Sequence, residues 1–402
     1  MTAGDRWKIL LGMSKPAATE AVHLPPAEIR RLQTGLLAWY RQHQRRLPWR
    51  ESRDFYPVWV SEVMLQQTQV QTVVPYFLRF MKAFPTLEDL AGADTRDLLR
   101  IWAGLGYYSR ARNLQKTARI LVREHGGEFP GSYREALRLP GIGRYTAAAI
   151  LSIAFDQPLP ALDGNVVRVL SRLFCLRGDP AKSPLQGMLA AAGRQLLPAD
   201  RPGDFNQALM ELGATVCLPR NPRCLLCPWS SHCEALKSGM QERLPEKGKR
   251  SEMVLSRQAA AVVRHRGRFL IRRRSGSRLL RDMWEFPGGE FSRSDLAGSL
   301  VKYLESELQL NVRLRDRLTV VRHAVTNRRI TLTVYEARLK PPLPPTLSVP
   351  GARWIWLSQA GRYPLTAAAS RIIQALTEEY SRRRSRPESG RRQVGLRAPL
   401  KP

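Results

Sequence analysis

The stretch from Leu139 to Arg168 constrains the fold more than any other part of this chain. Just before it, Ser132 and Glu135 have the S-x-x-E spacing of a capping box, which predicts the start of a short helix. The Pro-Gly-Ile-Gly turn at 140–143 ends that helix, and a second, apolar helix begins at about residue 144. Both glycines of the turn can take positive φ and bring the backbone close to a partner. The pattern predicts two helices joined by a tight turn, whose free N–H groups suit a phosphate.

A second turn follows at 162–165, where Leu-Asp-Gly-Asn precedes another predicted helix. Asp163 therefore stands at a helix N-terminus, where the helix dipole favours a negative charge. An ordinary helical hairpin followed by an aspartate cap would have the same pattern. The rest of the chain has to decide between this structural interpretation and a functional one.

The net charge indicates a polyanionic partner. The chain has 402 residues, with 65 Lys and Arg against 34 Asp and Glu, which gives a net charge of +31. Nucleic acid is the simplest partner for such an excess. With 43% hydrophobic residues the chain can form two or three domains, and global disorder is excluded. We expect no transmembrane helix and no secretion signal, because no long apolar run is present.

The pattern of residue types divides the chain into five segments. We expect an irregular segment at 1–26, an almost wholly helical domain at 27–236, a polar linker at 237–257, a small α+β domain at 258–380 and a basic disordered tail at 381–402. In the α+β domain we expect helices at 294–309 and 366–380, and strands at Ala259–Arg264, Arg268–Arg273, Leu318–Val325 and Ile330–Leu339.

Four cysteines crowd into one short segment. Cys217, Cys224, Cys227 and Cys233 have the spacing C-x6-C-x2-C-x5-C, and prolines stiffen the loops between them. Four thiolates over such a short span can hold one tetrahedral ion or one cubane cluster. From the spacing alone, zinc and an iron–sulfur cluster are equally good interpretations.

Several strings resemble one family of DNA repair enzymes. The span from about 35 to 235 resembles the helix-hairpin-helix DNA glycosylases that carry an iron–sulfur cluster, and within them the MutY-type adenine DNA glycosylases. The resemblance rests on LPWR at 47–50, SEVMLQQTQV at 61–70, GLGYYSR at 104–110, LPGIG at 139–143 and LDGNV at 162–166, together with the four cysteines. It implies a mainly α fold of two helical subdomains, a hairpin at 139–145 and a [4Fe–4S] loop at 217–233.

The resemblance also implies roles for individual residues. Protonated Glu62 would donate to adenine N7, and Asp163 would stabilise the cationic sugar that remains. Burial among Val60, Val63 and Met64 is expected to raise the pKa of Glu62. The complete expected sites are catalytic Glu62, Asp163, Tyr145 and Asn165; the adenine pocket Trp49, Arg50 and Glu211; and the DNA contacts Leu65, Gln66, Gln67, Tyr107, Gly141, Gly143 and Thr326.

The nearest alternative within this superfamily is the endonuclease III type. That type carries a lysine two residues after the second hairpin glycine, and the lysine forms a Schiff base that leads to strand cleavage. Here the position is Tyr145, which cannot form an imine, so we expect a monofunctional glycosylase. A DNA-binding protein without catalysis is a second alternative, and the intact Glu62 and Asp163 argue against it.

The C-terminal domain resembles a Nudix fold through WEFPGGEF at 284–291. Ser294, Tyr303 and Ser306 stand where three magnesium-binding glutamates belong, and only Glu307 remains, so we expect no pyrophosphate hydrolysis. In the family this domain recognises 8-oxoguanine through a Phe-Ser-His loop. The aligned residues here are Val325, Thr326 and Asn327, of which Thr326 keeps a hydroxyl.

Together these patterns predict one activity. We expect a monomeric, cytoplasmic, bacterial-type enzyme that binds double-stranded DNA and removes adenine mispaired with 8-oxoguanine or guanine, in base excision repair.

Overall fold

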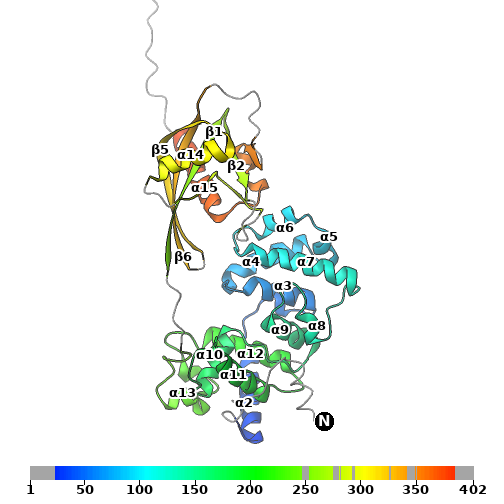
Figure 1. Cartoon of the computed structure of the whole chain (residues 1–402). Coiled ribbons are helices and arrows are strands. Elements are labelled where there is room, and N and C mark those ends of the chain that lie inside the picture. Colours follow the sequence, from blue (N-terminus) through cyan, green and yellow to red (C-terminus); the bar gives the residue numbers. More distant parts are fainter. Residues whose placement is uncertain are drawn as a thin grey trace, which may run out of the picture. The chain divides into compact units, whose positions relative to one another are not determined.

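The computed structural model describes residues 23–246, 253–274, 280, 282–291, 295–325, 327–341, 349 and 351–384. The chain divides into two compact units, Met1–Ser251 and Glu252–Pro402, and each is described by itself (Figure 1). Within the described ranges no helix is long and apolar enough to cross a lipid bilayer. Most of the predicted N-terminal irregular segment and C-terminal tail lies outside these ranges.

The first unit is built from helices, as the sequence predicts. Figure 1 shows α3 to α9 as one group, while a second group has a common apolar core formed by α2, α10, α11 and α12 with Trp229. The elements are α2 (Pro26–His43), η1 (Pro48–Arg50), α3 (Phe55–Leu65), α4 (Val70–Ala83), α5 (Leu87–Gly92), α6 (Thr95–Trp102), α7 (Tyr108–Glu124), α8 (Tyr133–Ala136), α9 (Arg144–Phe155), α10 (Gly164–Leu173), α11 (Ser183–Leu196), α12 (Pro202–Thr215), η2 (Cys224–Leu226), η3 (Ser230–His232) and α13 (Glu234–Lys237).

Two helix starts differ in how they are capped. Helix α3 begins at Phe55, where Asp54 caps it by accepting a hydrogen bond from Tyr56 N at 3.0 Å. Proline is tolerated there, since the first turn of a helix has no partner for its N–H groups. Helix α8 begins directly after Ser132, but the serine side chain makes no capping bond, so the predicted capping box is wrong.

The second unit is a mixed sheet of seven described strands with a helix on each face. The strands are β1 (Val254–His265), β2 (Arg268–Arg273), β3 (Trp284–Glu285), β4 (Gly288–Glu290), β5 (Val312–Val325), β6 (Arg328–Leu339) and β7 (Ala352–Ile355). Their order is β3-β2-β1-β6-β5, with β4 beside β1 and β7 beside β2; β1 and β6 are parallel. Alternate residues of β1 pack against α14 (Leu296–Leu308) and α15 (Ala367–Arg384).

The second unit departs from the prediction in three places. The sequence does not predict β3, β4 and β7, because runs of two to four residues show no usable periodicity. The linker predicted at 237–257 is narrower, since Leu244 is buried in the first unit and β1 begins at Val254. Helix α15 extends to Arg384, inside the predicted tail.

Candidate active site

The N-terminus of α10 holds Asp163 in a fixed orientation. Asp163 is the N-cap, and its Oδ1 accepts a hydrogen bond from Val166 N at 2.7 Å. Its Oδ2 accepts from Asn165 Nδ2 at 2.8 Å. The predicted turn and helix start are confirmed. Because each carboxylate oxygen has a donor, the half-buried side chain is presented in a single orientation.

Glu62 lies near the end of α3, at the contact between α3 and α9. Tyr145, in the first turn of α9, donates a hydrogen bond from its Oη to Glu62 Oε2. The same hydroxyl lies 3.6 Å from Met210 Sδ on α12. Glu62 is 5% exposed, and its neighbours Val60, Val63 and Met64 are also buried. The expected apolar surroundings of Glu62 are therefore present.

Glu62, Asp163 and Tyr145 affect one another's pKa values and therefore belong to one site. Burial raises the pKa of Glu62 from 4.5 to about 7; the bond from Tyr145 opposes this rise, and the charge of Asp163 adds to it. Burial also raises the pKa of Asp163, against the lowering effect of the bond from Val166 N. The pKa of Tyr145 is raised by burial and then by both carboxylates. Glu62 and Asp163 thus both interact electrostatically with Tyr145, and burial raises the pKa of both carboxyl groups.

Glu211 is fully buried and paired with two arginines. Its Oε1 accepts from Arg45 Nε at 2.6 Å, and its Oε2 accepts from Arg50 Nη2 at 2.8 Å. Burial by itself would raise the pKa of Glu211, but the bonds and charges of Arg45 and Arg50 outweigh it and lower the pKa. Trp49 is buried beside them, edge-on to Phe77 at 5.3 Å. The three residues expected in the adenine pocket therefore lie close together, and Arg45 belongs with them although the sequence did not single it out.

Arg168, on α10, links Asp163 to the cysteine loop. Its Nη2 donates to Asn165 Oδ1 at 2.9 Å and to Gly213 O at 2.7 Å, and its Nε donates to Cys217 O at 2.7 Å. Asn165 in turn holds Asp163. The sequence analysis did not single out Arg168. The signal available was an arginine in the first turn and a half of the helix that follows the Asp-Gly-Asn sequence.

The four cysteines line one small cavity of about 30 Å³, together with Arg172, Val216, Pro222, Ser230, Leu236 and Gln241. All four are free thiols, and Cys217 Sγ lies 3.3 Å from Arg172 Nη1. Among the residues that the structure describes, no group of three or more His, Cys, Asp or Glu is arranged to hold a single metal ion. The four cysteines therefore share one cavity.

The hairpin has one exposed glycine with positive φ, a conformation that other residue types rarely adopt. Gly141 has φ +80, and a Cβ there would lie 2.7 Å from Asn113 Cβ. Gly143, however, caps α9 with φ −94 and ψ 178, an ordinary extended conformation. The sequence permits positive φ at both glycines, and of the two the structure has it at Gly141. Both glycines are exposed at the start of α9, whereas the N–H of the buried Ile142 between them donates to Leu139 O at 3.1 Å.

Two exposed side chains project from neighbouring loops. Gln67 has φ 58, and Tyr107 has φ 48 with 47% exposure. Leu65 and Gln66 are half-buried, and Gln66 Nε2 donates to Thr146 Oγ1 at 3.3 Å. Left-handed φ is uncommon for residues other than glycine, and such residues gather at functional sites.

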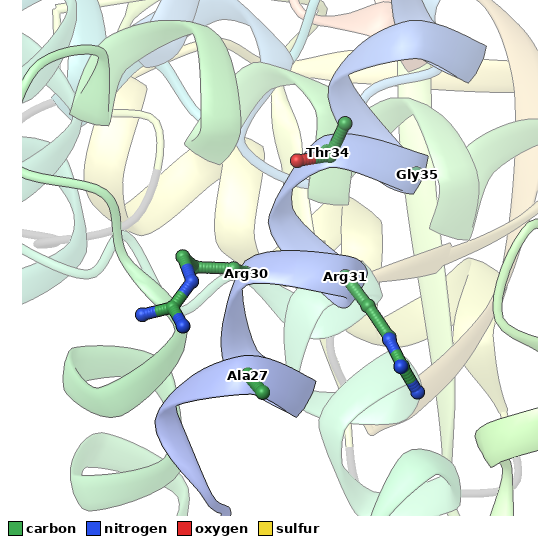
Figure 2. Close-up of a pocket in the computed structure, with 5 residues that line it drawn as sticks. All are labelled: Ala27, Arg30, Arg31, Thr34 and Gly35. Atoms are coloured by element: carbon green, nitrogen blue, oxygen red, sulfur yellow. The ribbon is translucent and has the colours of Figure 1, made fainter.

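The most voluminous hollow among those described lies away from these residues. It measures about 510 Å³ and is open to solvent on α2, where Ala27, Arg30, Arg31, Thr34 and Gly35 line it (Figure 2). Figure 2 shows Arg30 and Arg31 pointing away from each other, so they do not converge on a ligand. None of the expected site residues lines this hollow.

In the second unit the expected lesion contacts fall at the turn between β5 and β6. Val325 ends β5 and Asn327 precedes β6, whereas Thr326 lies outside the described residues. Tyr303 packs edge-on against Phe291 at 6.0 Å, and Glu307 is exposed on α14. An aromatic contact therefore occupies one of the positions expected for magnesium ligands in a Nudix enzyme.

Comparison with known proteins gives two family matches. Residues 60–192 match the HhH-GPD superfamily of base excision DNA repair proteins, and residues 258–375 match the NUDIX domain. The chain is 37% identical to the adenine DNA glycosylase of Rattus norvegicus, over 88% of this chain and 79% of that protein. It is 37% identical to the adenine DNA glycosylase of Homo sapiens, over 89% of this chain and 76% of that protein.

Among solved structures, a thermostable thymine-DNA glycosylase aligns with a TM-score of 0.49 and 28% identity, covering 53% of this chain and 98% of that one. The curated relatives are similar over both units, and the two family matches fall in the order in which the units occur. This chain belongs to the MutY-type adenine DNA glycosylases, with an HhH-GPD helical domain followed by a Nudix-like domain.

Proposed function

We propose that this chain hydrolyses the N-glycosidic bond of adenine in double-stranded DNA, where adenine stands opposite 8-oxoguanine or guanine, as a step in base excision repair. The observation that carries the proposal is the arrangement of Glu62 and Asp163 around Tyr145, with a Glu62 pKa of about 7. A carboxyl group with this pKa is protonated in a large fraction of molecules near neutral pH and can serve as a general acid.

The chemistry divides between the two carboxyl groups. Adenine leaves a deoxyribose poorly as an anion, so Glu62 donates a proton to ring N7 and turns it into a neutral leaving group. The departing base leaves an oxocarbenium-like sugar, which the carboxylate of Asp163 stabilises. Asn165 holds Asp163 by the 2.8 Å bond to Oδ2, and Tyr145 orients Glu62 through its hydroxyl.

The base has to leave the duplex before this reaction can occur. Gln67 and Tyr107, exposed on neighbouring loops, are suited to enter the space that the adenine vacates, with Leu65 and Gln66 beside them. The exposed turn at Gly141 and Gly143 offers N–H groups to a backbone phosphate, a contact that fixes register without reading sequence. Trp49, Arg50 and Glu211 form the wall that receives the extruded base.

Monofunctional chemistry follows from Tyr145. Strand cleavage through a Schiff base needs an amine at the sugar, and the group beside Glu62 is a phenol with a raised pKa. Water is then the nucleophile that completes the reaction, and the expected product is an abasic site in an intact strand.

The cysteine loop fits a [4Fe–4S] cluster. A cluster distributes its four thiolates over separate iron atoms, whereas a zinc ion needs all of them around one centre. Four cysteines that line one cavity can supply those four thiolates, and membership of the family favours the cluster. When bound, such a group would link Cys217, Cys224, Cys227 and Cys233 covalently to one another. Arg168 and Arg172 would then hold the linked loop against α10.

Single-turnover release of adenine tests the proposal. A duplex with adenine opposite 8-oxoguanine is mixed with excess protein, and free base is measured for the wild type, Asp163→Asn and Glu62→Gln. We expect release by the wild type and at least about a hundredfold loss in each variant, the combined scale of acid catalysis and electrostatic stabilisation. Equal release by all three proteins, or no release by the wild type, would overturn the catalytic assignment.

A further inference from the structure

Two loops that present exposed side chains meet at one buried arginine. Arg110, in the first turn of α7, is 8% exposed and lies between the chain after α3 and the glycine-rich turn before α7. Its Nη1 donates to Val63 O and Met64 O, both at 2.9 Å, and to Gln66 O; its Nη2 donates to Thr68 Oγ1 at 3.3 Å, Leu105 O at 3.2 Å and Gly106 O at 3.3 Å. Each of these acceptors is a backbone carbonyl or a hydroxyl.

Two of these carbonyls have a special position. The carbonyl of Gln66 belongs to the peptide that precedes Gln67, and the carbonyl of Gly106 belongs to the peptide that precedes Tyr107. The φ angle of a residue sets the orientation of the peptide that precedes it. By holding the carbonyls of these two peptides, Arg110 restrains the φ of Gln67 and of Tyr107. Their values are 58 and 48, in the left-handed region. Such a conformation costs of order 1–3 kcal/mol at a residue other than glycine and persists only where surrounding contacts hold it.

The guanidinium also supports the Tyr107 ring directly. Its central carbon lies 5.3 Å from the centre of the Tyr107 ring and 5.6 Å from that of Trp102. Burial lowers the pKa of Arg110 to about 10, so the group stays charged at neutral pH. A buried cation is costly, and here carbonyl dipoles of two separate loops compensate it, which makes the loop conformations and the charge depend on one another.

We propose that Arg110 is a positioning residue that holds Gln67 and Tyr107 in the geometry needed to extrude the adenine nucleotide. The inference rests on the proposed function, because it assigns to these two side chains the role of entering the duplex. Lysine cannot replace Arg110, since one ammonium with three donors cannot reach carbonyls on both sides, as the two Nη groups of the planar guanidinium do.

Arg110→Lys keeps the charge and removes this bridge. Arg119→Lys is the matched control: it lies on the same helix and also donates to loop carbonyls, Ala91 O at 2.9 Å and Ala93 O at 3.2 Å, but not to the loops of Gln67 and Tyr107. Both proteins are given two substrates, an adenine paired with 8-oxoguanine and an adenine opposite an abasic site. The second needs less unpairing before extrusion.

For Arg110→Lys we expect single-turnover adenine release to fall at least about tenfold on the paired substrate and by less than about threefold on the unpaired one. The fluorescence rise of 2-aminopurine placed at the adenine position should slow by the same factor as release from the paired substrate. Arg119→Lys should match the wild type in all three measurements. An equal loss on both substrates, whether from misfolding or damaged chemistry, would overturn the positioning role, as would wild-type rates on both.

A double-mutant cycle supplies a second reading. If Arg110 acts through Tyr107 as well as Gln67, Arg110→Lys should cost clearly less in the Tyr107→Ala background than in the wild type on the paired substrate. A full tenfold loss in that background would refute the coupling. Failure of this inference is distinguishable from failure of the proposed function, because the latter appears as absence of adenine release by the wild type.

Discussion

Glu62→Gln should make the folded protein more stable at alkaline pH while it removes activity. The pKa of Glu62 rises from 4.5 to about 7 on folding, chiefly through burial. Below pH 4.5 the carboxyl is protonated in both the folded and the unfolded chain, so it contributes nothing. As pH rises through the window from 4.5 to about 7, the unfolded chain releases this proton first, and stability falls. The full loss above that window is about 3 kcal/mol, at roughly 1.4 kcal/mol per pKa unit.

Glutamine has nearly the same shape and no proton to lose, so the variant escapes this loss. Free energies of unfolding from urea titrations at about pH 5 and about pH 8.5 should show an advantage of Glu62→Gln over the wild type that grows by about 2–3 kcal/mol. Glu128→Gln, at an exposed position, is the matched control and should show no growth. If the advantage of Glu62→Gln is the same at both pH values, Glu62 is not a buried acid with a raised pKa, and the proton-donor assignment loses its basis.

Three other measurements follow from the same geometry. The single-turnover rate of adenine release should fall as pH rises above about 7, because Glu62 loses its proton, and fall again in acid as Asp163 gains one; a flat profile would contradict this pair of roles. Gly213→Ala should lower both the rate of adenine release and the melting temperature, because the new Cβ would lie 2.6 Å from Asn165 Cβ, a clash that costs about 1–3 kcal/mol. Gly35→Ala is the control: it has open space around it and should stabilise the protein by up to about 1 kcal/mol. Equal effects of the two substitutions would refute the packing argument. Arg172→Met should reduce the iron and labile sulfide content of the purified protein. The substitution removes the hydrogen-bond donor to Leu218 O and Leu244 O and the charged neighbour of Cys217. Unchanged iron content would show that the cysteine loop does not depend on this arginine.

Local sequence signals were sufficient for the turn before α10 and for the helical character of the first unit. The turn at 162–165 predicts Asp163 as a cap, and the structure has it accepting from Val166 N. The helical character predicted for 27–236 is confirmed in α4, α11 and α12, each of which buries apolar side chains. The sequence did not decide whether Gly143 has positive φ, because a glycine permits that conformation without requiring it; in the structure its φ is −94.

The sequence by itself determined the helical character of the first unit, the helix–turn–helix at 132–155 and the concentration of four thiols in one loop, because each depends on neighbours within one or two turns. Only the tertiary structure decided which charges meet. Arg45 and Glu211 are 166 residues apart, and Arg168 reaches a carbonyl 49 residues away. Periodicity cannot report such pairs, since it records which face of an element is apolar and not what lies opposite it. The apolar neighbours of Glu62 could be read from the sequence, but its bond to Tyr145, 83 residues away on α9, is decided by the tertiary structure.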